Sequence, residues 1–163
     1  MRDSVSHIAH IDDAAVRLLR GDNGPLEEAA RVKFGFTNMG PQKGRSMKAP
    51  EVLSWWREAR GVMIVELSKC DPKKKIPWFA MPMGARAFAT ARLMETWAHG
   101  LDCFDAGGAV PEDTDRLRHV ALLAYMARRC VLLDECHAVS VARVGMIIIL
   151  SHVHRAMLAH YDS

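Results

Sequence analysis

The segment that decides the fold is ARAFATARLMETWAHGLDCFDA, residues 85–106, and two glycines follow it. Glycine directly after a periodic apolar pattern is typical of the end of an α-helix, so we expect a helix over 85–106. At about 100° per residue, Leu93, Trp97 and Phe104 fall on one side of this helix. The other side holds four polar residues, which are Arg92, Glu95, His99 and Asp102.

That polar side has two interpretations. Charged residues opposite an apolar stripe usually face water, and this is the simpler interpretation of the segment taken alone. The alternative is a metal site, because Glu95 and His99 are four residues apart, so their side chains lie one above the other and can reach one ion. The choice depends on whether another part of the chain supplies a further ligand.

An expected first helix, residues 3–20, with Asp3 or Ser4 as its N-cap, contains two histidines. On a helical wheel the apolar residues within about 40° of His7 are Ile11, Ala14 and Leu18. His7 is therefore predicted to point into the protein, whereas His10 lies among polar residues and is predicted to face solvent. A buried histidine is usually satisfied by one hydrogen bond, and leaving its imidazole without a partner costs on the order of a few kcal/mol.

The glutamate and histidine of the later helix would supply such a partner, most directly across a metal ion. His7, Glu95 and His99 combine two imidazoles with one carboxylate, which suits Zn²⁺, with Fe²⁺, Ni²⁺ or Mn²⁺ as alternatives. Three protein ligands leave a coordination position open, as in catalytic metal sites. Asp102 and Arg92, each one turn from a candidate ligand, would be groups that orient those ligands.

Other polar residues have simpler interpretations. Arg86 and Arg92 could clamp a substrate carboxylate, although exposed arginines on a helix are the simpler interpretation. His119 is expected to pack or cap within a later helix. Three histidines near the end of the chain could bind metal adventitiously, but we interpret them as surface residues: His152, His154 and His160.

The rest of the chain also predicts helices, with little sign of strands. Residues 49–69 and 112–133 have helical patterns, and a further helix could occupy the last thirty residues. Glycines and prolines predict a long loop over 21–48, with room for a short helical piece, and a break over 71–84. We therefore expect an all-α protein with antiparallel bundle packing.

Composition narrows the function classes. The 163 residues are half hydrophobic and carry a net charge of +3, so the chain resembles a globular domain rather than a nucleic-acid-binding or disordered one. None of the four cysteines forms a CxxC pair, which favours reduced thiols over a zinc-thiolate site or disulfides. A charged N-terminus and the absence of a long apolar run predict a cytoplasmic protein that does not enter a membrane.

Four stretches of the sequence resemble a known family. They are VSHIAHID at 5–12, SWWREAR at 54–60, PWFAMPMGARAFATARLMETWAHGLDCFDA at 77–106 and EDTDRLRHVA at 112–121. Together they resemble the mycothiol-dependent maleylpyruvate isomerase metal-binding family of the DinB-like superfamily, and most closely an uncharacterised actinobacterial subgroup. The resemblance runs from about Asp3 to Ala124.

The resemblance implies a DinB-like four-helix bundle whose metal ligands are His7, Glu95 and His99. The isomerase that names the family uses zinc and the low-molecular-weight thiol mycothiol, and its thiolate adds to a conjugated double bond, permits rotation and leaves. The implied function is thus that of a metal-binding protein that acts on a small molecule as a thiol-dependent isomerase or transferase. The alternatives are a non-catalytic metal-binding bundle and an inactive truncated fragment. The subgroup implies no particular substrate.

The chain also departs from the family pattern. Relatives begin with an additional helix before the first histidine, so we expect this chain to lack the first helix of the bundle. After about residue 124 the resemblance fades, which suggests an incomplete metal-binding bundle domain over 1–135 and a divergent C-terminal tail over 136–163, for which a helix is one alternative. The tail, or a second copy of the chain in a homodimer, would cover the apolar surface left by a missing helix.

Overall fold

The computed structural model describes residues 1–79, 81–112, 115–116 and 118–120. Its elements are α1 (Arg2–Leu19), α2 (Gly24–Val32), the short 3-10 helix η1 (Lys33–Gly35), α3 (Phe36–Arg45), α4 (Ala49–Ser68), the strands β1 (Lys75–Ile76) and β2 (Met83–Gly84), and α5 (Ala85–Gly107). The expected all-α class is confirmed. Most of the expected helix at 112–133, the expected C-terminal helix and the domain boundary at 135 lie outside the described residues, although 118–120 are helical.

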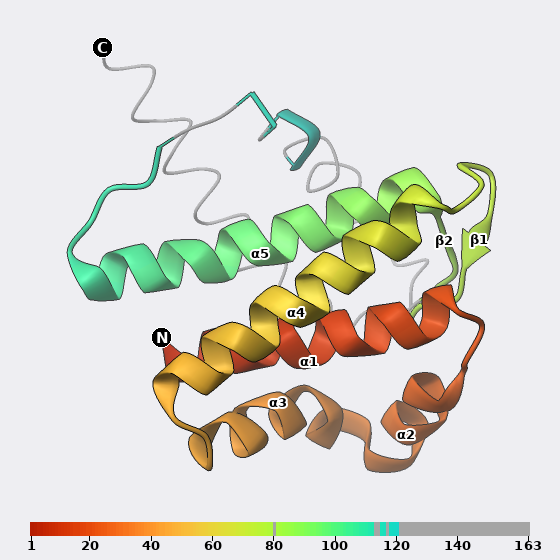
Figure 1. Ribbon diagram of the computed structural model, residues 1–163. Coiled ribbons are helices and arrows are strands. Elements are labelled where there is room, and N and C mark those ends of the chain that lie inside the picture. The colour runs from red at the N-terminus through yellow and green to blue at the C-terminus, as the bar shows by residue number, and fades with distance from the viewer. Residues whose placement is uncertain (80, 113–114, 117, 121–163) are drawn as a thin grey trace, which may run out of the picture.

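Helix α1 is the central element of the fold. Helices α3, α4 and α5 all pack against it. Figure 1 shows α3 on one side of α1 and α5 on the other, with α4 crossing both α1 and α5 in front. Helices α1 and α5 run antiparallel, because His7 near the start of α1 contacts His99 late in α5, while Leu19 at the end of α1 shares a core cluster with Ala85.

The ends of the long helices follow from local sequence. Pro50 lies in the first turn of α4, and the Glu51 carboxylate accepts a hydrogen bond of 2.7 Å from the Lys48 amide. Helix α5 is followed by Gly108 in the left-handed conformation, with φ of 65°. The expected cap of α1 is wrong: the helix already includes Asp3, whose carboxylate pairs with Arg45 of α3 instead of capping.

The long loop expected over 21–48 is also wrong, because this region forms α2, η1 and α3. Pro25 lies in the first turn of α2, a position where proline favours a helix. Gly40 and Gly44, which suggested a loop, are buried in α3 against α1. Tertiary packing therefore overrides their low helix propensity.

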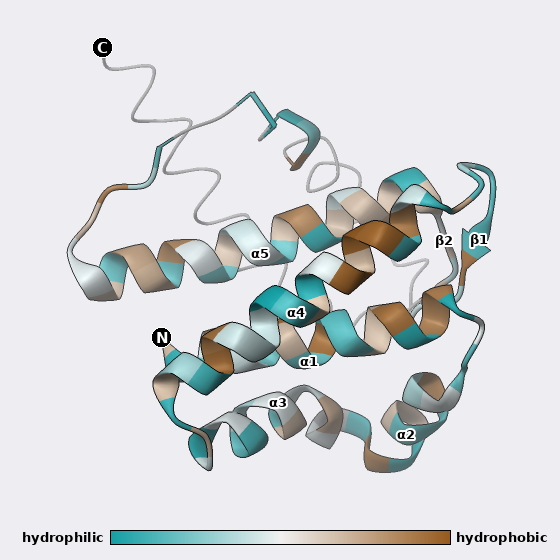
Figure 2. Cartoon of the chain, viewed as in Figure 1, coloured by the Kyte–Doolittle hydropathy of each residue, from teal (hydrophilic) through white to brown (hydrophobic). Residues whose placement is uncertain are grey.

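The main hydrophobic core joins α1, α4, α5 and β1. Ile76 and Phe88 are fully buried in it, and the Trp78 ring meets Phe88 edge to face with centroids 4.9 Å apart. Figure 2 shows hydrophobic segments along both α1 and α4. The β1–β2 hairpin, paired through Ile76 and Met83, thereby connects α4 to α5 and fixes where α5 begins.

Two findings concern the expectations about thiols and membranes. Cys70 and Cys103 are both free cysteines, whereas Cys130 and Cys136 lie outside the described residues. Within the part of the chain that the structure describes, no helix combines the length and the apolar character needed to cross a bilayer.

A buried ion group links α1, α4 and α5. The fully buried Asp12 carboxylate accepts a hydrogen bond of 2.8 Å from Arg60 Nε and one of 3.0 Å from Arg92 Nη2. Thr96 accepts from Arg60 and donates to the Arg92 carbonyl. Arg92 is only 3% exposed, so the interpretation of this residue as a surface arginine is wrong: α1 provides a carboxylate that pairs with it. Arg86 is exposed, as that interpretation expects.

The first prediction concerns this ion group. Asp12→Ala leaves the buried Arg92 and the half-buried Arg60 without their carboxylate, and breaking a buried ion pair in this way costs about 3–5 kcal/mol. We therefore expect the free energy of unfolding, measured in urea, to fall by that amount. Asp3→Ala removes an exposed partner of Arg45 and should change the free energy of unfolding little. Equal effects of the two substitutions would contradict the role of Asp12.

Candidate metal centre

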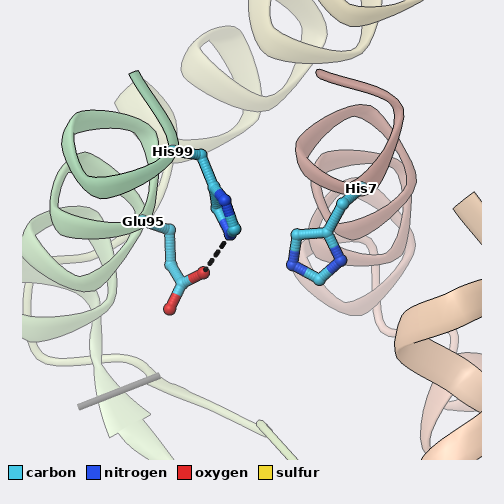
Figure 3. Close-up of side chains that lie close together, drawn as sticks. All are labelled: His7, Glu95 and His99. Carbon is cyan, nitrogen blue, oxygen red and sulfur yellow. Dashed lines mark ion pairs between the residues drawn. The ribbon is translucent and has the colours of Figure 1, made fainter. Parts of the chain in front are cut away.

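Three side chains from the two antiparallel helices α1 and α5 converge at one point. His7 comes from α1, and Glu95 and His99 come from successive turns of α5 (Figure 3). One nitrogen or carboxylate oxygen of each lies within 4.8 Å of the other two, and all three residues are half-buried. The His7 and His99 rings are 4.9 Å apart between centroids, and His99 Nε2 is 3.8 Å from Glu95 Oε2.

The spacing of these atoms fits a single metal ion. Ligands about 2.1 Å from Zn²⁺ at tetrahedral angles lie roughly 3.4 Å from one another. The three donor atoms lie within 4.8 Å of one another, which approaches that spacing. Two imidazoles and one carboxylate are also a donor set found in catalytic zinc sites. Among the described residues this is the one group of three or more potential ligands at such distances.

The protonation of His7 suits a metal ligand. Its Nδ1 lies 3.1 Å from the carbonyl oxygen of Thr37 in α3. A carbonyl only accepts, so Nδ1 carries the proton and Nε2 has the free lone pair. Figure 3 shows the ring with its other nitrogen turned toward Glu95 and His99. Burial lowers the pKa of His7, and the hydrogen bond to Thr37 opposes this only in part, so the neutral form is favoured.

His99 has a carboxylate on the side away from this point. Its Nδ1 lies 3.4 Å from Asp102 Oδ2, yet this buried nitrogen has no hydrogen bond of acceptable geometry. A small rotation of either side chain would complete that bond. It would place the proton on Nδ1 and leave Nε2 available beside Glu95. Asp102 therefore lies where a carboxylate that orients a metal-binding histidine would be needed.

The other sequence candidates lie elsewhere. Arg92 is committed to Asp12 and also lies over the Trp78 ring, with 5.8 Å between the guanidinium carbon and the ring centroid. The prediction that His10 faces solvent is wrong, because its ring packs against Phe36 of α3 at 4.8 Å. His10 instead lines a groove of about 460 Å³ between α1, α2 and α4, outside the converging group.

Sequence reasoning missed two contributors to this region, Thr37 and Asp12. Thr37 contributes a backbone carbonyl, so its residue type carries no signal, and the region around it was expected to be a loop. Asp12 lies within the stretch VSHIAHID, and an acidic residue between the apolar positions of a helix would have been the available signal.

The second prediction concerns pH in the metal-free protein. Burial lowers the pKa of both His7 and His10, so the unfolded chain binds their protons more readily than the folded protein does. Stability is then fully present above the unfolded pKa of about 6.5 and is lost as pH falls toward the folded values.

We expect the free energy of unfolding, measured in chelator, to decrease between about pH 7.5 and 5.5. His10→Gln should make this decrease smaller while leaving the three converging residues intact. The prediction fails if stability is constant over this range.

Comparison with known proteins supports a family assignment. The model of the mycothiol maleylpyruvate isomerase N-terminal domain matches residues 1–104. Two uncharacterised proteins of Mycobacterium tuberculosis, one from strain CDC 1551 and one from a second strain, are similar to this chain. Each is 37% identical to it over 127 residues, and the alignment covers 76% of this chain and 49% of the relative. The chain thus spans about half the length of these curated relatives. No solved structure matches. Since the family model covers most of the described helices, the chain belongs to the mycothiol maleylpyruvate isomerase N-terminal domain family.

Proposed function

We propose that the protein binds one divalent metal ion, Zn²⁺, through His7 Nε2, the Glu95 carboxylate and His99 Nε2. We further propose that this centre serves a thiol-dependent isomerase or transferase. The observation that carries the proposal is the convergence of the three donor atoms to within 4.8 Å from two separate helices. Membership of the family supports the thiol, because the isomerase that names the family uses mycothiol.

Neighbouring groups favour the protonation states that a metal requires. The Thr37 carbonyl holds the His7 proton on Nδ1, and Asp102 is close enough to His99 to do the same there. Both imidazoles then present an unprotonated nitrogen to the same point. Partners of this kind orient ligands in metalloproteins and raise their basicity.

The charges around the site favour an anionic ligand. When bound, Zn²⁺ would lower the pKa of a thiol so that it is a thiolate at neutral pH. Glu95 and the Asp102 carboxylate beside His99 together carry two negative charges, which balance the two positive charges of the ion. The adjacent ion group has two arginines for one aspartate, so the region keeps an excess of positive charge. A thiolate in the open position would therefore bring this part of the protein closer to neutrality.

Low-molecular-weight thiols are kept reduced in the cytoplasm, which is where we propose that the protein acts. The free cysteines Cys70 and Cys103 are compatible with that environment.

A non-catalytic metal-binding protein is the second candidate. The observation that favours it concerns the two arginines that the sequence offers as a clamp for a substrate carboxylate. Arg92 is paired with Asp12, and Arg86 is exposed on the first turn of α5. A substrate carboxylate would thus need a partner other than these two residues.

The third prediction tests metal binding. Purified protein should contain about one zinc per chain. The substitutions His7→Gln, Glu95→Gln and His99→Gln should each weaken zinc binding by more than about 100-fold, because loss of a residue that only orients a ligand costs up to about that factor. His10→Gln is the matched control, because His10 lies one turn away and should not alter the affinity. Elemental analysis and competition with a chromophoric chelator provide the measurement. If the wild-type protein carries no stoichiometric metal, both metal-binding candidates fail and only the interpretation as an inactive fragment remains.

The fourth prediction separates the enzyme from the simple metal-binding protein. Zinc-loaded protein should isomerise or thiolate an unsaturated diacid only when mycothiol is present, and Glu95→Gln should abolish this turnover. Chromatography of the products from a panel of such diacids provides the measurement. Metal binding without turnover of any member of the panel would favour the non-catalytic candidate.

A further inference from the structure

Helix α3 contains an unusual sequence where it meets the candidate ligand His7. Residues 37–44 read TNMGPQKG, so a proline and two glycines occur within a helix of ten residues. Each of these residues lowers helix stability, and proline does so most strongly. The two glycines lie at the contact between α3 and the first turns of α1.

Pro41 acts on the carbonyl that binds His7. In an α-helix the carbonyl of residue 37 points at the backbone N–H of residue 41. Proline has no N–H, and its ring crowds the carbonyl four residues earlier, which tilts that carbonyl away from the helix axis. Thr37 is the residue four before Pro41, and its carbonyl oxygen is 3.1 Å from His7 Nδ1.

Gly40 and Gly44 bring α3 close enough for this contact. A Cβ atom at Gly40 would lie 2.5 Å from the Ser6 carbonyl oxygen and 3.1 Å from the His7 Cα atom. A Cβ atom at Gly44 would overlap the Ser6 side chain. Only a hydrogen atom fits at either position, so the backbone of α3 lies directly on α1 beside His7.

We infer that Pro41 in α3 is a positioning residue for the metal centre: by withholding a backbone N–H from the Thr37 carbonyl, it keeps that carbonyl directed at His7 Nδ1 and so presents His7 Nε2 to the metal. The consequence for the metal rests on the proposed function, whereas the effect on the His7 tautomer does not. A carbonyl oxygen can accept two hydrogen bonds, so the role of Pro41 lies in the direction of the carbonyl, which the proline ring tilts away from the helix axis, and other contacts of Thr37 are compatible with it.

Pro41→Ala tests the inference, because alanine restores the N–H. We expect the Thr37 carbonyl to turn toward residue 41 and release His7, which should weaken zinc or Co²⁺ binding by about 10–100-fold. The thermal midpoint of the metal-free protein should stay the same or rise, because proline in a helix interior is destabilising. A merely structural role of Pro41 would instead lower the midpoint and the affinity together.

A second measurement requires no metal. Nitrogen-15 spectra of the imidazole, recorded about two units above the ordinary histidine pKa, report which ring nitrogen carries the proton. Wild-type His7 should show the Nδ1–H form, and Pro41→Ala should gain the Nε2–H form. Pro50→Ala, in the exposed first turn of α4, is the matched control and should change neither the tautomer nor the affinity.

The outcomes separate this inference from the proposed function. A Pro41→Ala protein with an unchanged tautomer overturns the inference, as does a fall in its thermal midpoint that accompanies the loss of metal. If the wild type binds no metal but shows the predicted change of tautomer, the proposed function fails and the role of Pro41 toward His7 stands.

Discussion

The candidate metal centre depends on the buried ion pair between Asp12 and Arg92. It fixes the register of α1 against α5, and Arg60 extends the same constraint to α4. Both helices rise about 1.5 Å per residue and run antiparallel. With Asp12 held opposite Arg92, the residue five positions before Asp12 must lie opposite the segment that follows Arg92. That residue is His7, and the segment contains Glu95. A buried ion pair adds little net stability over apolar packing, because both charges lose water, and we assign its effect here to register.

The sequence predicted the helices and the inward position of His7 because both follow from local periodicity. Helices were expected over 3–20, 49–69 and 85–106, and the structure has α1, α4 and α5 there with ends within two residues. The helical wheel also placed His7 in the apolar stripe of α1, and the residue does point into the protein toward α5. Its role as a ligand stays a prediction.

Periodicity failed where a second element covers a polar side. Arg92 and His10 both lie on sides of their helices that the wheel marks as polar, and both are nevertheless covered. Asp12 makes burial of Arg92 possible, whereas His10 is covered by Phe36 of α3. A wheel describes one helix at a time, so it cannot show a partner from a distant part of the chain. The same limit left the Thr37 carbonyl unseen.

Helix α3 shows why the loop prediction failed and what the failure indicates. An isolated helix of ten residues is marginal even with favourable residues, and two glycines add a cost of about 1 kcal/mol each and an interior proline about 3 kcal/mol. The segment is helical because its glycines allow it to pack directly on α1, where burial offsets those costs. A sequence that needed only a helix here would have no use for these residues. Conflict between local propensity and structure tends to occur at functional positions, and in this protein it occurs at the contact with His7.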